Sequence, residues 1–180
     1  MERLNSHGDY TACPELFAAV EWAGYIAGCL IVLKNEGYTD DLPGTRLFLT
    51  SNVPEGKGVS SSASVEVASM KAIVAALQLR IDDMILVELC QMVENRVVGA
   101  SCGIMDQMTA MMGQKGKLMK LLCQPCTLLG HLEIPPELSI VGIDSGEQHS
   151  ISGSNYTSVR IGAFMGLKIL RSEERRVGKE

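Results

Sequence analysis

The pattern of apolar and polar positions predicts a chain of mixed helices and strands. Long segments rich in apolar residues favour helices, and short apolar or β-branched runs bounded by turn residues favour strands. The predicted helices are residues 14–36, 63–79, 82–98 and 159–170. The predicted strands are residues 46–52, 117–123, 127–134 and 139–144.

Several helix ends carry local signals of their own. Gly37 and Gly99 directly follow the predicted helices 14–36 and 82–98, and glycine is the usual residue just past a helix C-terminus. Asp82 can cap the helix that follows it, because an aspartate side chain accepts a hydrogen bond from a free backbone N–H. In this helix three polar positions recur at i, i+3 and i+7 and predict an exposed stripe: Glu88, Gln91 and Asn95.

The segment 54–64 joins the predicted strand 46–52 to the helix 63–79. It contains two glycines, Gly56 and Gly58, and three serines at 60–62. Glycine lets the backbone approach a ligand closely, and serines suit the first turn of a helix, where backbone N–H groups are free. A strand, a Gly/Ser loop and a helix N-terminus together predict an anion site, with phosphate as its usual occupant.

Two better-known phosphate loops do not fit these residues. A Walker A loop needs Lys and Ser/Thr after its last glycine, whereas Gly58 is followed by Val59. The dinucleotide-binding loop needs a third glycine where Ser61 stands. From the residues alone, an ordinary turn before an N-capped helix remains an equal alternative to a phosphate site.

Glu94 is the first of two carboxylates in apolar surroundings. Its helical neighbours on the same face are Val87, Cys90, Val97 and Val98. A carboxylate there is costly unless a cation or a metal ion compensates its charge. The alternative is a rim residue that reaches water or pairs with Arg96 or Lys71.

Asp106 is the second such carboxylate. It is the only acidic residue between Glu94 and Glu133 and stands among Gly, Ile and Met. An isolated carboxylate in this setting is either a turn or capping residue or a chemically active group, and the residues alone do not separate these alternatives.

Composition limits the class of protein. The chain has 180 residues, which predicts one domain, and its net charge of −5 disfavours nucleic acid and anionic membranes as partners. Six scattered cysteines predict reduced core thiols and a cytoplasmic location, with the pair Cys123 and Cys126 more typical of structural thiols than of a redox or zinc site. The longest apolar run is too short to span a bilayer.

Two stretches resemble one family of enzymes. The run Pro-Glu-Gly-Lys-Gly-Val-Ser-Ser-Ser-Ala-Ser at 54–64 and the run Cys-Gly-Ile-Met-Asp-Gln at 102–107 resemble the GHMP small-molecule kinases, in their sugar-1-kinase branch. The resemblance implies an α+β fold, a mixed sheet with helices packed on it, like the N-terminal domain of these kinases. It also implies ATP on the loop, bound by Pro54, Gly56, Gly58, Val59, Ser60, Ser61, Ser62 and Ala63.

The same resemblance implies roles for four side chains. Ser62 and Glu94 would bind Mg²⁺, and Asp106 would serve as catalytic base and contact the sugar. Tyr156 would be a further sugar contact. The implied reaction is transfer of a phosphoryl group from ATP to the anomeric hydroxyl of a monosaccharide, with a non-catalytic sugar or nucleotide sensor as the alternative of another class.

Within this branch, residues 53–62, 142–146 and 158–166 are most similar to the arabinose kinases. An upstream substrate motif and a third glycine-rich motif of the family are absent from these 180 residues. The chain is therefore predicted to be a fragment, with residues 1–170 forming part of the N-terminal domain. Residues 171–180 are abruptly charged and are predicted to be a tail outside the fold.

Overall fold

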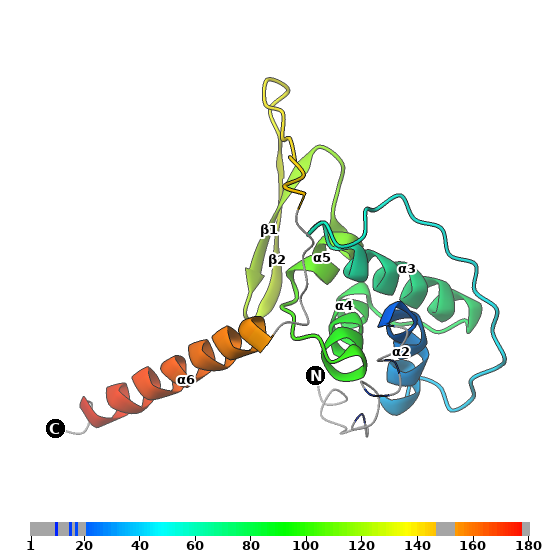
Figure 1. Cartoon of the computed structure of the whole chain (residues 1–180), viewed down its shortest axis with the longest axis horizontal. Coiled ribbons are helices and arrows are strands. Elements are labelled where there is room, and N and C mark those ends of the chain that lie inside the picture. Colours follow the sequence, from blue (N-terminus) through cyan, green and yellow to red (C-terminus); the bar gives the residue numbers. More distant parts are fainter. Residues whose placement is uncertain (1–9, 11–14, 16, 18–20, 147–153, 178–180) are drawn as a thin grey trace. The chain divides into compact units, whose positions relative to one another are not determined.

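The computed structural model describes residues 10, 15, 17, 21–146 and 154–177. These belong to two compact units, residues 1–149 and 150–180 (Figure 1). The helices of the first unit are α2 (Glu21–Asn35), α3 (Ser61–Ala76), α4 (Asp83–Met92), the π-helical η2 (Val93–Val98) and α5 (Met105–Met112). Its strands are β1 (Lys117–Cys123) and β2 (Cys126–Glu133), and the second unit contains α6 (Ser154–Val177). The predicted α+β class is confirmed.

The main core lies between α2, α3, α4 and η2. Gly28 lets α2 approach η2 closely, because a Cβ atom at this position would lie 2.6 Å from Cγ1 of Val93. The buried side chains that fill this core include Cys29, Val32, Leu33, Val67, Met70, Ile73, Leu86, Leu89, Cys90, Val93 and Val97. Each buried aliphatic side chain of this size contributes about 1.5–3 kcal/mol of hydrophobic stabilisation.

The helix ends are formed as the local signals predict. Gly37 and Gly99 have φ angles of 73° and 81°, the left-handed region that glycine enters without a steric cost. The backbone N–H of Met84 donates to Oδ1 of Asp82 at 2.8 Å, so Asp82 caps α4. The predicted helix 82–98 is continuous to Val98, but its last part is the π-helical turn η2.

The two strands form an antiparallel hairpin that covers a second, smaller core. β1 agrees with the predicted strand 117–123, and β2 begins one residue before the predicted 127–134. Cys123 pairs with Cys126 at the turn, and the ladder shifts register between Lys120 and Leu121. The hairpin and α5 pack around this second core, which contains Val87, Ile104, Met108, Met119, Leu121 and Leu128.

Two predicted strands are wrong. Residues 46–52 and 139–144 are not strands in the structure, and the only sheet among the described residues is the hairpin of β1 and β2. Phe48 is 94% exposed and Ile143 is 92% exposed. A strand exists only when its backbone pairs with a neighbouring strand. Neither segment has such a neighbour in the described part of the chain, so the mixed sheet is reduced to two strands.

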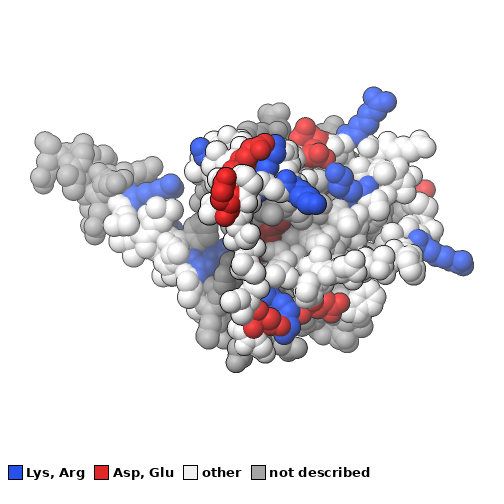
Figure 2. Space-filling view, turned by 90° about the horizontal axis from the view of Figure 1, so that it is seen from above, with Lys and Arg blue, Asp and Glu red and all other residues white. Residues whose placement is uncertain are grey.

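The second unit is described by itself. α6 begins before the predicted helix 159–170 and continues to Val177, so it includes most of the segment predicted to be a tail. None of the helices in the described ranges is both long and apolar enough to cross a membrane. Figure 2 shows acidic and basic side chains interspersed on the visible face, with wide areas between them that carry neither.

Candidate active site

The loop before α3 has the backbone shape of an anion site. Gly56, Gly58 and Ser60 have φ angles of 65°, 68° and 59°. For a serine this left-handed conformation is uncommon and is often found at functional sites. The side chain of Ser60 makes no capping hydrogen bond, and the first helical bond runs from the Ser64 N–H to the Ser60 carbonyl. The N–H groups of residues 61–63 therefore precede the helical hydrogen bonds and are free to bind an anion.

The loop also carries a positively charged side chain, Lys57. Lys57 Nζ lies 3.0 Å from Oδ2 of Asp144. Asp144 accepts a further hydrogen bond from the backbone N–H of Gly146 at 2.9 Å. These two donors lower the pKa of Asp144, and the backbone N–H of Gly146 has a larger effect than the ammonium group of Lys57. Both members of the pair are partly exposed, so their attraction is weak in water and sensitive to salt.

A buried triad of Glu66, Glu94 and Gln107 lies between α3, η2 and α5. The side-chain amide of Gln107 donates to Oε2 of Glu94 at 2.7 Å and to Oε2 of Glu66 at 3.2 Å. Glu66 and Gln107 are fully buried, and Glu94 is 2% exposed. The remaining oxygens, Oε1 of each of the three side chains, have no hydrogen-bond partner. The prediction that Glu94 lies in apolar surroundings agrees with this burial.

No basic residue in the described ranges forms an ion pair with either carboxylate of the triad. Arg96, one of the two cations considered for Glu94, instead lies 3.6 Å from Oε1 of Glu36. The other, Lys71, is exposed on α3. The alternative of a rim residue paired with Arg96 or Lys71 is therefore wrong.

Burial raises the pKa of Glu66 well above its ordinary value, and the nearby carboxylate of Glu94 raises it further. The hydrogen bond from Gln107 acts in the opposite direction, since it favours the charged form. The site thus favours the protonated form of Glu66.

The residues present fit a magnesium ion held partly by the protein. Ser62 and Glu66 lie four residues apart on α3 and share one face of that helix. Glu94 is linked to this face through Gln107, and its Oε1 atom has no partner. In the described residues, no group of three His, Cys, Asp or Glu side chains is placed to hold a metal. Magnesium commonly binds through one or two protein ligands together with substrate phosphates, which suits Ser62 and Glu94. Their assignment as metal ligands stays a prediction.

The predicted exposed stripe on α4 and η2 is wrong, because two of its members hold the segment before α5. The backbone N–H of Cys102 donates to Oδ1 of Asn95 at 3.0 Å. Gln91 Nε2 donates to the carbonyl oxygen of Cys102 at 3.3 Å. All three stripe residues are half-buried. Their contacts fix the chain only a few residues before Asp106.

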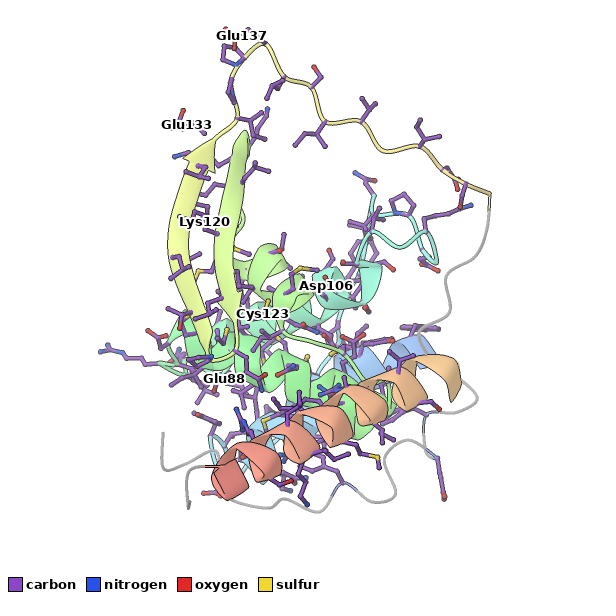
Figure 3. All side chains as sticks on the ribbon, turned by 90° about the vertical axis from the view of Figure 1, so that its left-hand side faces the viewer. Glu88, Asp106, Lys120, Cys123, Glu133 and Glu137 are labelled. Carbon is purple, nitrogen blue, oxygen red and sulfur yellow. The ribbon has the colours of Figure 1, made fainter. Side chains whose placement is uncertain are left out.

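Asp106 lies in the first turn of α5 and is half-buried. The N-cap of this helix is Ile104, without a side-chain hydrogen bond, so Asp106 does not cap the helix. The carboxylate forms no hydrogen bond or ion pair with any other residue that the structure describes. Figure 3 shows Asp106 beside the start of α3, and α5 packs against α3. A free carboxylate near the Gly/Ser loop can accept a proton from a bound hydroxyl group.

Tyr156 is not part of the unit that contains this site. It lies in α6, which belongs to the other unit, and its side chain is outside the described residues. Its role as a sugar contact stays a prediction.

Glu66 and Gln107 were not predicted from the sequence to be site residues. Glu66 has Ala63, Val67 and Met70 as helical neighbours, and all three are buried. A carboxylate on the buried face of a helix is the same signal that identified Glu94. Gln107 lies inside the 102–107 motif, but an amide carries no charge that would single it out.

The chain is similar in sequence to proteins of one family. Residues 24–114, about half of the chain, match the GHMP kinases N terminal domain. An L-arabinokinase of Arabidopsis thaliana is 52% identical over 154 residues, which are 86% of this chain and 15% of the relative. A galactokinase of Limosilactobacillus fermentum is 36% identical over 146 residues, which are 79% of this chain and 37% of the relative. The chain thus spans well under half the length of these curated relatives. With the family domain matched across the loop, the buried triad and Asp106, the chain belongs to the GHMP kinases.

Proposed function

We propose that the chain provides the nucleotide loop and the catalytic carboxylate of a sugar 1-kinase whose substrate is L-arabinose. The observation that carries this proposal is a pair of carboxylates that form no ion pair with a described residue, Asp106 beside the start of α3 and Glu94 in the buried triad. Asp106 is free and partly accessible, and Glu94 is buried with an unpartnered oxygen. The 52% identity to an L-arabinokinase supports the choice of sugar.

In the proposed reaction, the backbone N–H groups of residues 61–63 bind the ATP phosphates. Asp106 accepts the proton of the anomeric hydroxyl group as its oxygen attacks the γ-phosphorus, and ADP leaves with the electrons of the broken P–O bond. Magnesium, held by Ser62 and Glu94, would neutralise charge on the phosphates. Positioning and charge neutralisation supply most of the acceleration, because a carboxylate is a weak base towards an alcohol.

Galactokinase activity is the alternative within the family, supported by the 36% identity to a bacterial galactokinase. L-Arabinose has the ring configuration of D-galactose but lacks the hydroxymethyl group, so a site for one can be close to a site for the other. A non-catalytic sensor is the alternative of another class. A sensor has no need of an acid that is left without a partner, and Asp106 is such an acid.

The test uses a polypeptide that spans the full length of these relatives and carries these residues. ADP release is measured in a coupled assay with L-arabinose, D-galactose and other monosaccharides. We expect the highest kcat/KM with L-arabinose, and loss of ADP release in an Asp106→Asn variant. A higher value with D-galactose would favour the alternative sugar, and sugar binding without turnover would favour the sensor. Failure to bind both ATP and sugars would overturn the proposal.

A further inference from the structure

The buried triad connects three elements that each carry a proposed site residue. Glu66 lies one helical turn after Ser62 on α3, and Glu94 is in η2. Gln107 follows Asp106 directly on α5. Two hydrogen bonds of this amide group, which also contacts Sγ of Cys102, therefore join the helix of the phosphate loop, the helix of the proposed metal ligand and the helix of the proposed base.

An amide suits this position better than any other side chain. Its NH₂ group has two hydrogens, one for each carboxylate, and it brings no charge into a buried site. A lysine would form an ion pair with Glu94 and compete with a metal ion. Gln107 instead occupies Oε2 of Glu94 and leaves Oε1 without a partner.

Hydrogen bonds of this kind fix the direction of a metal-binding carboxylate. Partners outside the ligand set orient the ligands, and their loss commonly lowers metal affinity or activity by about 10- to 100-fold. The contact from Gln107 to Glu94, at 2.7 Å, is the shorter of the two. The contact to Glu66, at 3.2 Å, prevents the amide from rotating away.

We propose that Gln107 is a positioning residue that aims Glu94 at the metal ion, and that Glu66 serves as the acceptor that holds the Gln107 amide in place. Glu66 acts in this arrangement through its hydrogen bond and is not itself a metal ligand. The inference rests on the proposed function for the presence of a metal–nucleotide complex. Gln107 and Glu66 thereby join the proposed site, and substitutions can test the role of each residue separately.

The test measures metal binding separately from catalysis, in the same full-length polypeptide. Mn²⁺ is titrated into the protein with ADP, and bound Mn²⁺ is read by electron paramagnetic resonance. Replacement of Gln107 with leucine keeps the volume and removes both donors, so Gln107→Leu should weaken Mn²⁺ binding by about 10- to 100-fold. The Mg²⁺ concentration for half-maximal sugar phosphorylation should rise by a similar factor, with the KM for sugar little changed.

A pair of variants at Glu66 separates the acceptor role from a charge or a ligand role. Glu66→Gln keeps an acceptor oxygen for the amide of Gln107 and removes the acid, so Mn²⁺ binding should stay close to that of the unsubstituted protein. Glu66→Leu removes the acceptor and should resemble Gln107→Leu. If Glu66→Gln lost binding as strongly as Glu66→Leu, Glu66 would be a charged ligand and the proposal would be overturned.

Ile73→Ala provides the control for loss of stability. Ile73 is buried on α3, away from the triad in sequence, and truncation of such a residue costs about 2–5 kcal/mol. This variant should melt at a lower temperature with unchanged Mn²⁺ affinity. Unchanged Mn²⁺ affinity in Gln107→Leu, or no Mn²⁺ binding by the unsubstituted protein with ADP, would overturn the inference. Metal binding without sugar phosphorylation would instead overturn only the proposed function.

Discussion

The guanidinium of Arg96 lies 3.6 Å from the carboxylate of Glu36 and therefore does not neutralise Glu94, two residues before it. Arg96 also lies over the ring of Tyr10, 5.4 Å from its centroid. The Tyr10 hydroxyl group donates to the same Glu36 oxygen at 3.0 Å. Burial and the Glu36 carboxylate both raise the pKa of Tyr10. These three residues form a structural contact between separate parts of the chain. Arg96 is therefore not the counter-charge of Glu94.

The first prediction concerns this contact. Arg96→Met keeps the aliphatic stem and removes the cation, which leaves the buried carboxylate of Glu36 with less compensation. The free energy of unfolding should fall by about 1–3 kcal/mol. Urea denaturation measures the loss. In a Glu36→Gln background the same substitution should cost clearly less, since the charge pair is already gone. An equal loss in both backgrounds would show that Arg96 stabilises the fold without its ion pair to Glu36, through packing and its contact with the Tyr10 ring.

The second prediction concerns the proposed base. Asp106→Asn preserves size but removes the proton acceptor, so the turnover number in the full-length kinase should fall by about 10²–10⁴-fold. The melting temperature should change little, because Asp106 forms no capping hydrogen bond. Asp83→Asn is a matched control, since Asp83 is also an acid in the first turn of a helix. A variant at Asp106 that is less stable but turns over normally would contradict the assignment.

The third prediction is a pH dependence. The pKa of Glu66 is raised in the folded chain, so the folded state retains a proton that the unfolded state loses. Stability from this group is fully present below the ordinary glutamate pKa and is lost as the pH rises through the folded value. The loss is about 1.4 kcal/mol for each unit by which the pKa is raised. The ionisable groups that interact with Glu66 are an acid and thiols: Glu94, Cys29, Cys90 and Cys102.

Denaturant titrations at several pH values above 4.5 measure this effect. The unsubstituted chain should lose stability with rising pH, and Glu66→Gln should show a flatter profile because it has no proton to lose. Glu88→Gln is the control, since Glu88 is only half-buried and lies outside the triad. Identical profiles for the chain and Glu66→Gln would refute the prediction.

The fourth prediction concerns the two segments that were expected to be strands. Phe48 and Ile143 are almost fully exposed, and other apolar side chains of the same segments are exposed as well. The 180-residue chain should therefore bind an environment-sensitive apolar dye. Phe48→Ser combined with Ile143→Ser should reduce dye fluorescence, whereas Lys115→Ser should leave it unchanged. Absence of dye binding by the unsubstituted chain would count against the prediction.

Local signals predicted much of the fold. The glycines at 37 and 99 and the cap at Asp82 act within one helical turn, so neighbouring residues are enough to identify them. The hairpin was also predictable, because its two strands are adjacent in sequence. Residues 46–52 were predicted wrongly because pairing depends on a distant segment, and the apolar pattern of a strand does not show whether that partner is present.

The site was predicted only in part for a similar reason. The apolar neighbours of Glu94 indicated its burial, and the motifs indicated Asp106 and the loop. The donor to Glu94, Gln107, lies 13 residues later, and Glu66, which accepts from the same amide, lies 28 residues earlier. The polar residues Gln91 and Asn95 were misassigned because helical periodicity cannot distinguish a side chain that meets water from one that binds a nearby loop.

The π-helical turn η2 makes the number of residues here as important as their identity. Such a turn accommodates more residues than an α-helical turn, and it is often found at functional sites. Deletion of one residue between Glu94 and Gly99 would let the chain rewind as an α-helix, so the side chains within this turn would face new directions. Asn95 would then no longer face Cys102, and the chain leading to Asp106 would lose its anchor. Substitutions should accordingly be tolerated in this stretch far better than insertions or deletions, so its length is itself a determinant of the site.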